Sequence, residues 1–254
     1  MRQRTGRLLT AALVLSLIAS PSLSISQEAD DWDFAEDISR KLTVATASYS
    51  AGTSIIVHCQ DGELNVVMLG LPASHENLRR LDATRSDGTT DTQAWVVGEG
   101  KMLTSNMPSR DARFLRVGGA LRLRSSAGQP SPISASFELP TQHANLDRVI
   151  SGCGYELEND RDRIPRADPQ HRLTRKPPRS EGGRPGHSIE VSCLVRAGAY
   201  QECRADHVET NTDRQSIRGG VNSWNRARVH LEDATANEGR VVYIFIPLLL
   251  MVYD

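Results

Sequence analysis

One stretch in the second half of the chain most constrains the fold. Residues 158–187 contain five prolines and eight Lys or Arg residues against five acidic residues, with almost no apolar side chains. Such a segment cannot bury enough apolar surface to offset the entropy lost on ordering. We therefore predict a semi-extended basic linker between an N-terminal domain at 27–157 and a C-terminal domain at 188–254. We favour a solvated hinge over a basic arm that touches peptidoglycan or anionic lipid.

Residues 1–26 have the features of a secretory signal peptide. Three arginines precede an apolar stretch over 8–19, and small residues follow Pro21. A helix over this stretch reaches about 18 Å, which is short of the ~30 Å hydrocarbon core of a membrane. We predict export to the periplasm with cleavage after Ser24 or Ser26, and the alternative is a retained membrane anchor.

The charge balance and the few aromatic residues exclude some classes of function. The chain has 30 Lys or Arg residues and 31 Asp or Glu residues, and aromatic residues make up 5%. Such a chain lacks both the basic surface and the stacking platforms of nucleic-acid-binding proteins. We expect no nucleic-acid partner, and membrane contact that is at most peripheral, through the basic linker.

A hairpin is the clearest unit of the N-terminal domain. An Asp-Gly pair joins residues 54–60 to residues 63–69, and both runs are rich in apolar side chains. Asp-Gly between strands indicates a two-residue turn, because both turn residues need positive φ. In the register that this turn sets, Cys59 lies opposite Leu64 on a wholly apolar face.

A helix is predicted over 144–153, capped by Thr141 or Asn145. Its apolar residues follow the spacing of one helix face and are Leu146, Val149, Ile150 and Cys153. If this helix lies on the apolar face of the hairpin, Cys153 approaches Cys59.

The remaining elements of the N-terminal domain are shorter. We predict strands over 93–97, 101–104, 120–124 and 133–139 and a short helix over 109–117, with Ser109 as its cap. Trp95 and Phe137 are interpreted as core residues. Residues 30–37 are interpreted as a solvated acidic start whose Trp32 and Phe34 pack on the domain. Strands without a βαβ rhythm indicate an α+β fold with an antiparallel sheet and a packed helix.

The C-terminal domain has the order ββαβ. Its predicted elements are strands over 188–195 and 200–208, a helix that begins at Thr212, and a final strand over 240–253. With Gly198 at the centre of the turn, Cys193 faces Cys203 across the hairpin. Four cysteines in an exported chain predict two disulfides, Cys59–Cys153 and Cys193–Cys203. Zinc is disfavoured because no CxxC or Cys/His cluster is present.

This C-terminal pattern resembles the C-terminal module of the TonB family of periplasmic proteins. The matching residues are Gly186, Ile189, Val191, Cys193, Val195, Ala199 to Cys203 and Glu209, followed by a match over 239–250. The resemblance covers about 186–254. It implies a ββαβ fold that binds partners by pairing an exposed strand edge with an extended peptide.

The resemblance makes the final strand the candidate binding edge. Val241, Tyr243 and Phe245 lie in the longest apolar run of the C-terminal domain and are the candidate partner-binding residues. A bare apolar edge promotes aggregation, so we expect a partner, a second copy or the linker to cover it. The partner is expected to be a protein or peptide of the cell envelope. The sequence determines neither its identity nor the oligomeric state.

A TonB-type energy transducer is the first alternative. Such proteins keep an N-terminal anchor with a coupling His and carry a long proline-rich span. The apolar stretch over 8–19 has no His, and a linker of this length reaches only ~30 Å as a flexible coil. We therefore expect the fold to carry over and the energy-transducing activity not to.

Residues 54–153 also resemble the VasI-type accessory family of type VI secretion. The matching segments are 56–61, 114–117, 121–124 and 135–139, which precede the helix that ends in Cys153. In that family the first and last cysteines mark the ends of the domain. The resemblance therefore supports the pairing of Cys59 with Cys153 and adds no chemistry.

The sequence contains no recognisable catalytic motif. It lacks H-E-x-x-H, G-x-S-x-G, S-x-x-K, the phosphate loop and the dinucleotide fingerprint. Acidic pairs such as Glu99 with Asp111, or a cluster of Asp30, Asp31 and Asp33, occur in any exported chain of this length. We expect no enzymatic activity, no cofactor and no metal. An envelope enzyme with an unrecognised site is the second alternative.

Overall fold

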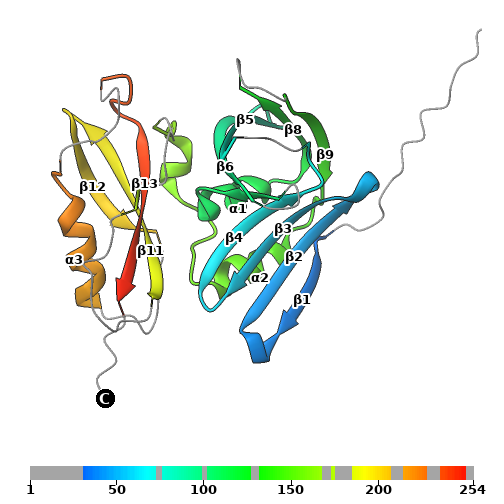
Figure 1. Cartoon of the computed structure of the whole chain (residues 1–254), viewed down its shortest axis with the longest axis horizontal. Helices are drawn as coiled ribbons and strands as arrows, with labels where there is room; N and C mark the ends of the chain where they lie inside the picture. Colours follow the sequence, from blue (N-terminus) through cyan, green and yellow to red (C-terminus); the bar gives the residue numbers. More distant parts are fainter. Residues whose placement is uncertain are drawn as a thin grey trace, which may run out of the picture.

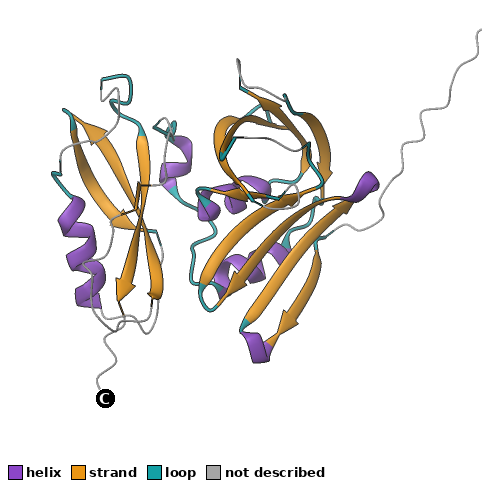
Figure 2. Cartoon of the chain, viewed as in Figure 1, coloured by secondary structure: helices purple, strands orange, loops and turns teal. Residues whose placement is uncertain are grey.

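The structure is a computed structural model that describes residues 31–72, 76–98, 102–126, 132–167, 173–174, 185–206, 214–227 and 235–249. The predicted signal peptide and the middle of the predicted linker lie outside these residues. The described residues form mostly antiparallel sheet with three α-helices, so the fold class is α+β (Figure 2). None of the described helices is long and apolar enough to cross a membrane.

The first sheet has nine strands in the order β1-β2-β3-β4-β7-β6-β5-β8-β9, and all neighbours are antiparallel. These strands are β1 (Asp33–Asp37), β2 (Leu42–Tyr49), β3 (Thr53–Gln60), β4 (Glu63–Leu69), β5 (Leu78–Arg85), β6 (Thr90–Val97), β7 (Leu103–Ser105), β8 (Gly119–Ser125) and β9 (Ser134–Leu139). The helices α1 (Pro108–Leu115) and α2 (Ala144–Gly152) accompany it. The sheet curls, so that β9 comes towards the upper end of β2 (Figure 1).

The second sheet has four strands in the order β10-β13-β11-β12. They are β10 (Leu173–Thr174), β11 (Pro185–Arg196), β12 (Ala199–Ala205) and β13 (Val241–Leu249), with α3 (Arg214–Trp224) packed on the sheet. β10 is parallel to β13, and the other pairs are antiparallel. The order β11-β12-α3-β13 agrees with the predicted ββαβ arrangement.

The first predicted hairpin is confirmed residue by residue. Cys59 pairs with Leu64 and Val57 with Val66. Both turn residues have positive φ, 51° at Asp61 and 82° at Gly62, as a two-residue turn of this type requires.

The structure contains the two disulfides that the sequence analysis expects. Cys59 and Cys153 are joined with 5.5 Å between their Cα atoms, across a sequence separation of 94 residues. Cys193 and Cys203 are joined across a separation of 10 residues within the β11–β12 hairpin. The first bridge therefore ties α2 to the sheet, and the second constrains only one hairpin.

The N-terminus of α2 is capped differently from the prediction. No side chain of its own sequence neighbourhood caps it. Instead, Asp31 Oδ2 accepts a hydrogen bond from the backbone N–H of Asn145 at 3.2 Å, and Asn145 Nδ2 donates to the carbonyl oxygen of Trp32 at 2.8 Å. A carboxylate at a helix N-terminus also complements the helix dipole, so the chain segment before β1 holds α2 in place.

The acidic start of the domain forms a strand. Residues 33–37 make β1, which pairs with β2, and Trp32 is buried in the main core as expected. Phe34 packs against that core from one face of β1. Phe34 is the only large apolar residue in these five positions, so the residues of β1 carry no clear strand pattern.

Residues 158–167 differ from the predicted linker. Asp160–Arg163 form a short 3-10 helix, and Arg161, Arg166 and Ala167 are buried. These charged residues are ordered because they meet opposite charges and carbonyl groups from both domains, as described below.

Candidate functional site

The predicted partner-binding residues lie on β13, which is an interior strand. β13 pairs with β11 on one side and with β10 on the other, next to a bridge between Arg166 and Val241. Val241 and Tyr243 are buried, and the side chain of Phe245 lies outside the described part of the structure. The structure therefore differs from the predicted open edge: a segment of the linker, one of the three expected covers, occupies it.

One face of the C-terminal sheet contacts the N-terminal domain at Met107. Val241 and Tyr243 pack with Leu194 of β11 and with Met107, which precedes α1. Burial and the nearby carboxylate of Asp206 raise the pKa of the Tyr243 hydroxyl above its ordinary value. These apolar side chains thus serve contact between the two domains.

The outer edge of β12 is also occupied. The backbone N–H of Tyr200 donates to the carbonyl oxygen of Ala227 at 2.9 Å, and the N–H of Arg226 donates to the carbonyl oxygen of Tyr200 at 2.6 Å. A guanidinium N–H of Arg161 donates to the carbonyl oxygen of Glu202, where positive φ marks a bulge. Strand addition at these positions of the C-terminal sheet would require these contacts to break.

A polar interface joins α1 to the segment 160–163 and to β11. Ser109 Oγ donates to Glu190 Oε1 at 2.8 Å, and Arg113 binds Asp162 through two hydrogen bonds of 2.6 and 2.9 Å. Ser109 is not the predicted cap of this helix, because α1 begins at Pro108 with Met107 as its N-cap. The interface therefore uses residues that are far apart in the sequence.

Arg166 is a buried cation of this interface. It is 4% exposed and contacts Asp111, which is fully buried, and Asp91, whose Oδ2 accepts from Arg166 Nε at 2.7 Å. Burial alone would lower the pKa of Arg166, but the carboxylates of Asp111 and Asp91 outweigh it and hold the pKa above its ordinary value. The arginine is thus engaged by internal acids, which leaves it no role as an arm for anionic surfaces.

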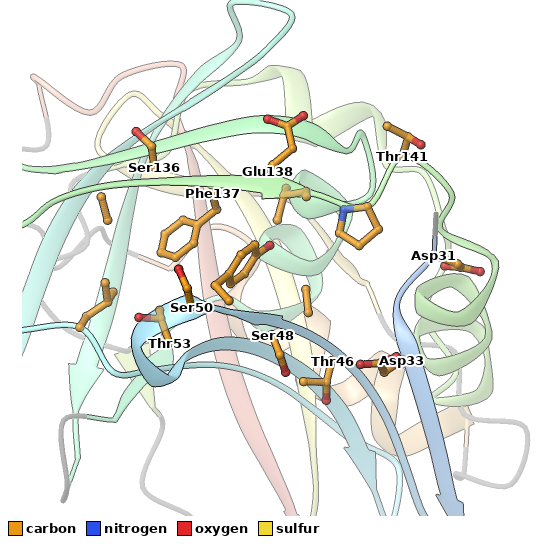
Figure 3. Close-up of a pocket in the computed structure, with 16 residues that line it drawn as sticks. Asp31, Asp33, Thr46, Ser48, Ser50, Thr53, Ser136, Phe137, Glu138 and Thr141 are labelled. Carbon is orange, nitrogen blue, oxygen red and sulfur yellow. The ribbon is translucent and has the colours of Figure 1, made fainter. Parts of the chain in front are cut away.

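An open groove of about 720 Å³ lies in the N-terminal domain (Figure 3). β2 forms one wall and β9 the other. β1 pairs with β2 only from Leu42 to Thr46, so residues 47–49 continue beyond it. In the described part of the chain, no strand pairs with that side of residues 47–49 or with the outer side of β9. The groove therefore lies between two sheet edges that lack strand partners.

The walls of the groove have an apolar and a polar layer. On β9, Phe137 and Leu139 are buried whereas Ser136 and Glu138 are exposed. The strand period of two produces this alternation. The rings of Phe137 and Tyr49 are in contact, with 5.0 Å between their centroids. These two rings form the floor between the two walls.

The hydroxyl of Tyr49 is buried and has no hydrogen-bond partner among the described residues. Burial, with a smaller effect from Glu138, raises its pKa above the ordinary value. A buried hydroxyl without a partner costs free energy. The hydroxyl is therefore an unsatisfied group beneath the floor of the groove, out of contact with solvent.

The groove has acidic but no basic residues in its described lining. Its carboxylates are Asp31, Asp33 and Glu138. Asp31 already accepts hydrogen bonds from two backbone N–H groups, and neither Asp33 nor Glu138 forms an ion pair with another described residue. No group of three or more metal-ligating side chains occurs in the described part of the chain. The arrangement is suited to holding a ligand by backbone and charge.

The structure separates Asp111 from the other acidic residues that the sequence analysis named. Asp111 is part of the interface with Arg166, whereas Asp31 and Asp33 line the groove. Asp30 and Glu99 lie outside the described residues. Sequence analysis predicted the strand over 133–139 but missed the strand over 42–49, and no local signal places the two side by side.

Comparison of the chain with protein-family models, with curated proteins and with solved structures finds no significant match.

Proposed function

We propose that this protein is an exported, non-enzymatic protein of the periplasm that binds a protein or peptide partner by strand pairing. The observation that carries the proposal is the groove between β2 and β9, where two sheet edges have no strand partner among the described residues. Backbone groups along such edges give affinity without special side chains, in keeping with a sequence that has no recognisable catalytic motif. Two disulfides fit an oxidising compartment.

The C-terminal module has a supporting role in this proposal. Its order of elements supports the resemblance to the TonB C-terminal module. Its strand edges, however, are engaged at Tyr200 and Val241 by other parts of the chain. We therefore assign partner binding to the N-terminal domain and not to β13.

Site-specific cross-linking tests the proposal. A photo-reactive amino acid at Ser136 faces the groove, whereas one at Arg122, its exposed neighbour on β8, serves as the matched control. In the exporting cell, we expect a polypeptide adduct from position 136 and none from position 122. Equal adducts from both positions contradict the proposed site. Turnover of peptidoglycan or periplasmic peptides by the purified protein would instead favour the enzyme alternative.

A further inference from the structure

We propose that the groove between β2 and β9 receives an extended segment of a partner protein in which basic and apolar residues alternate. This inference rests on the proposed function and specifies its ligand. The segment would lie between residues 47–49 and β9 as an additional strand. It would then connect the two edges of the curled sheet.

Backbone pairing is the first argument. Ala47 to Tyr49 pair with β3 on one side only, and Ser134–Leu139 of β9 pair with β8 on one side only, within the described residues. Alternate N–H and C=O groups of an antiparallel strand point away from its existing neighbour. An inserted strand would pair with these groups on both sides, whereas a compact ligand would reach few of them.

The side-chain pattern of the two walls predicts the pattern of the ligand. Ala47, Phe137 and Leu139 are buried, whereas Ser48, Ser136 and Glu138 are exposed. Those six residues define an inner apolar layer and an outer polar layer. A strand between the walls places its own residues alternately in the same two layers. Its inward residues should therefore be apolar and its outward residues polar.

Charge selects which polar residues these are. Asp33 lies directly opposite Thr46 across β1 and β2, on the same outer layer as Glu138. The described lining contains no Lys, Arg or His residue to balance these carboxylates. Opposite charges on neighbouring strands attract, and like charges repel. Outward Lys or Arg residues therefore fit, and outward acidic residues do not.

Four synthetic peptides of about eight residues, enough to span β9, test the inference against the disulfide-bonded exported protein. The first alternates Lys and Val, and the second alternates Glu and Val. The third has the Lys/Val sequence with alternate backbone amides methylated, and the fourth has the same composition with all Lys before all Val. We expect calorimetry to show binding of the first peptide, at least about tenfold weaker binding of the others, and weakening by salt.

Groove variants test the location. The double variant Asp33→Asn, Glu138→Gln should bind the Lys/Val peptide about five- to tenfold more weakly. The matched control Glu63→Gln, an exposed residue of β4 outside the groove, should leave the affinity unchanged. Hydrogen exchange should slow on binding at backbone amides within 47–49 and 135–138.

The outcomes separate this inference from the proposed function. Equal binding of Lys/Val and Glu/Val peptides overturns the inferred charge preference and leaves strand pairing intact. If the methylated peptide binds as tightly as the unmethylated Lys/Val peptide, strand pairing is wrong and so is the proposed function. If no peptide binds while Ser136 still cross-links to a polypeptide, the inferred ligand is wrong and the partner-binding proposal stands.

Discussion

The two sheets of this protein differ in how some of their edge positions are covered. In the C-terminal sheet, backbone groups of Tyr200 and Val241 bond to Ala227 and Pro165. In the N-terminal sheet, the outer side of β9 faces a groove and has no strand partner among the described residues. Exposed edges invite pairing with other chains, and proteins usually cover them. This difference is the reason why the proposed partner-binding position lies at the edge of β9.

The largest expected effect is the loss of stability when the disulfide of either domain is removed. Replacing Cys59 and Cys153 by Ala removes closure over 94 residues, whereas replacing Cys193 and Cys203 removes closure over 10. The chain-entropy relation gives losses of about 4–5 and about 2–3 kcal/mol in the free energy of unfolding. Urea unfolding of the two double variants measures both. Equal losses would show that loop closure does not distinguish the domains.

The second prediction concerns the interface that covers the C-terminal sheet. Arg166→Met leaves the buried carboxylate of Asp111 without its cation, whereas Asp91 keeps its ion pair with Arg110. Removing one partner of a buried ion pair costs about 3–5 kcal/mol. Arg148→Met is the matched control, because Arg148 is exposed and its pair with Glu36 should contribute at most about 1 kcal/mol. Similar losses in the two variants would contradict the role given to Arg166.

Hydrogen exchange tests the comparison of edges directly. The amides of Tyr200 and Val241 donate to carbonyl groups, so their exchange requires local opening. The amides of β9 that face the groove have no strand partner among the described residues. They should exchange at least about tenfold faster in the free protein. Equal protection of both sets, as measured by NMR or mass spectrometry, would mean that the groove edge is covered in solution.

The smallest expected effect is on how the free energy of unfolding depends on pH. Burial lowers the pKa of His58 on β3 below its ordinary value of 6.5, and its Nδ1 has no partner among the described residues. The unfolded chain therefore binds more protons between the two pKa values, and stability rises with pH there. The contribution is fully present above about pH 6.5 and is lost as the pH falls through the lower, folded pKa. His58→Gln should flatten this slope in urea unfolding between pH 7 and 5. An unchanged slope would assign the acid sensitivity to other groups.

Much of the local fold could be predicted from the sequence. The Asp-Gly turn determined the register of β3 and β4, because both turn residues need positive φ. Apolar spacing located α2 and turned Cys153 towards the sheet. These signals work because each depends on residues that are close together along the chain.

The candidate site could be predicted only in its parts. Phe137 was correctly expected in the core, but the groove depends on β2 and β9, which lie about ninety residues apart and meet only because the sheet curls. The strand edge at Val241 is covered, and this too depends on residues that are distant in the sequence. Its cover comes from Pro165 and from β10, which no local pattern assigns to it.

The sequence by itself determined the hairpins, the main helices and a consistent cysteine pairing, since turn geometry and side-chain period are local properties. Tertiary structure decided which charged residues are buried and which are exposed. Composition predicted a solvated linker at 158–187, yet Arg166 within it is buried because Asp91 and Asp111, more than fifty residues away, offset its desolvation. It also decided which sheet edges are covered, because an edge is defined by the strands beside it in space and not by its own residues.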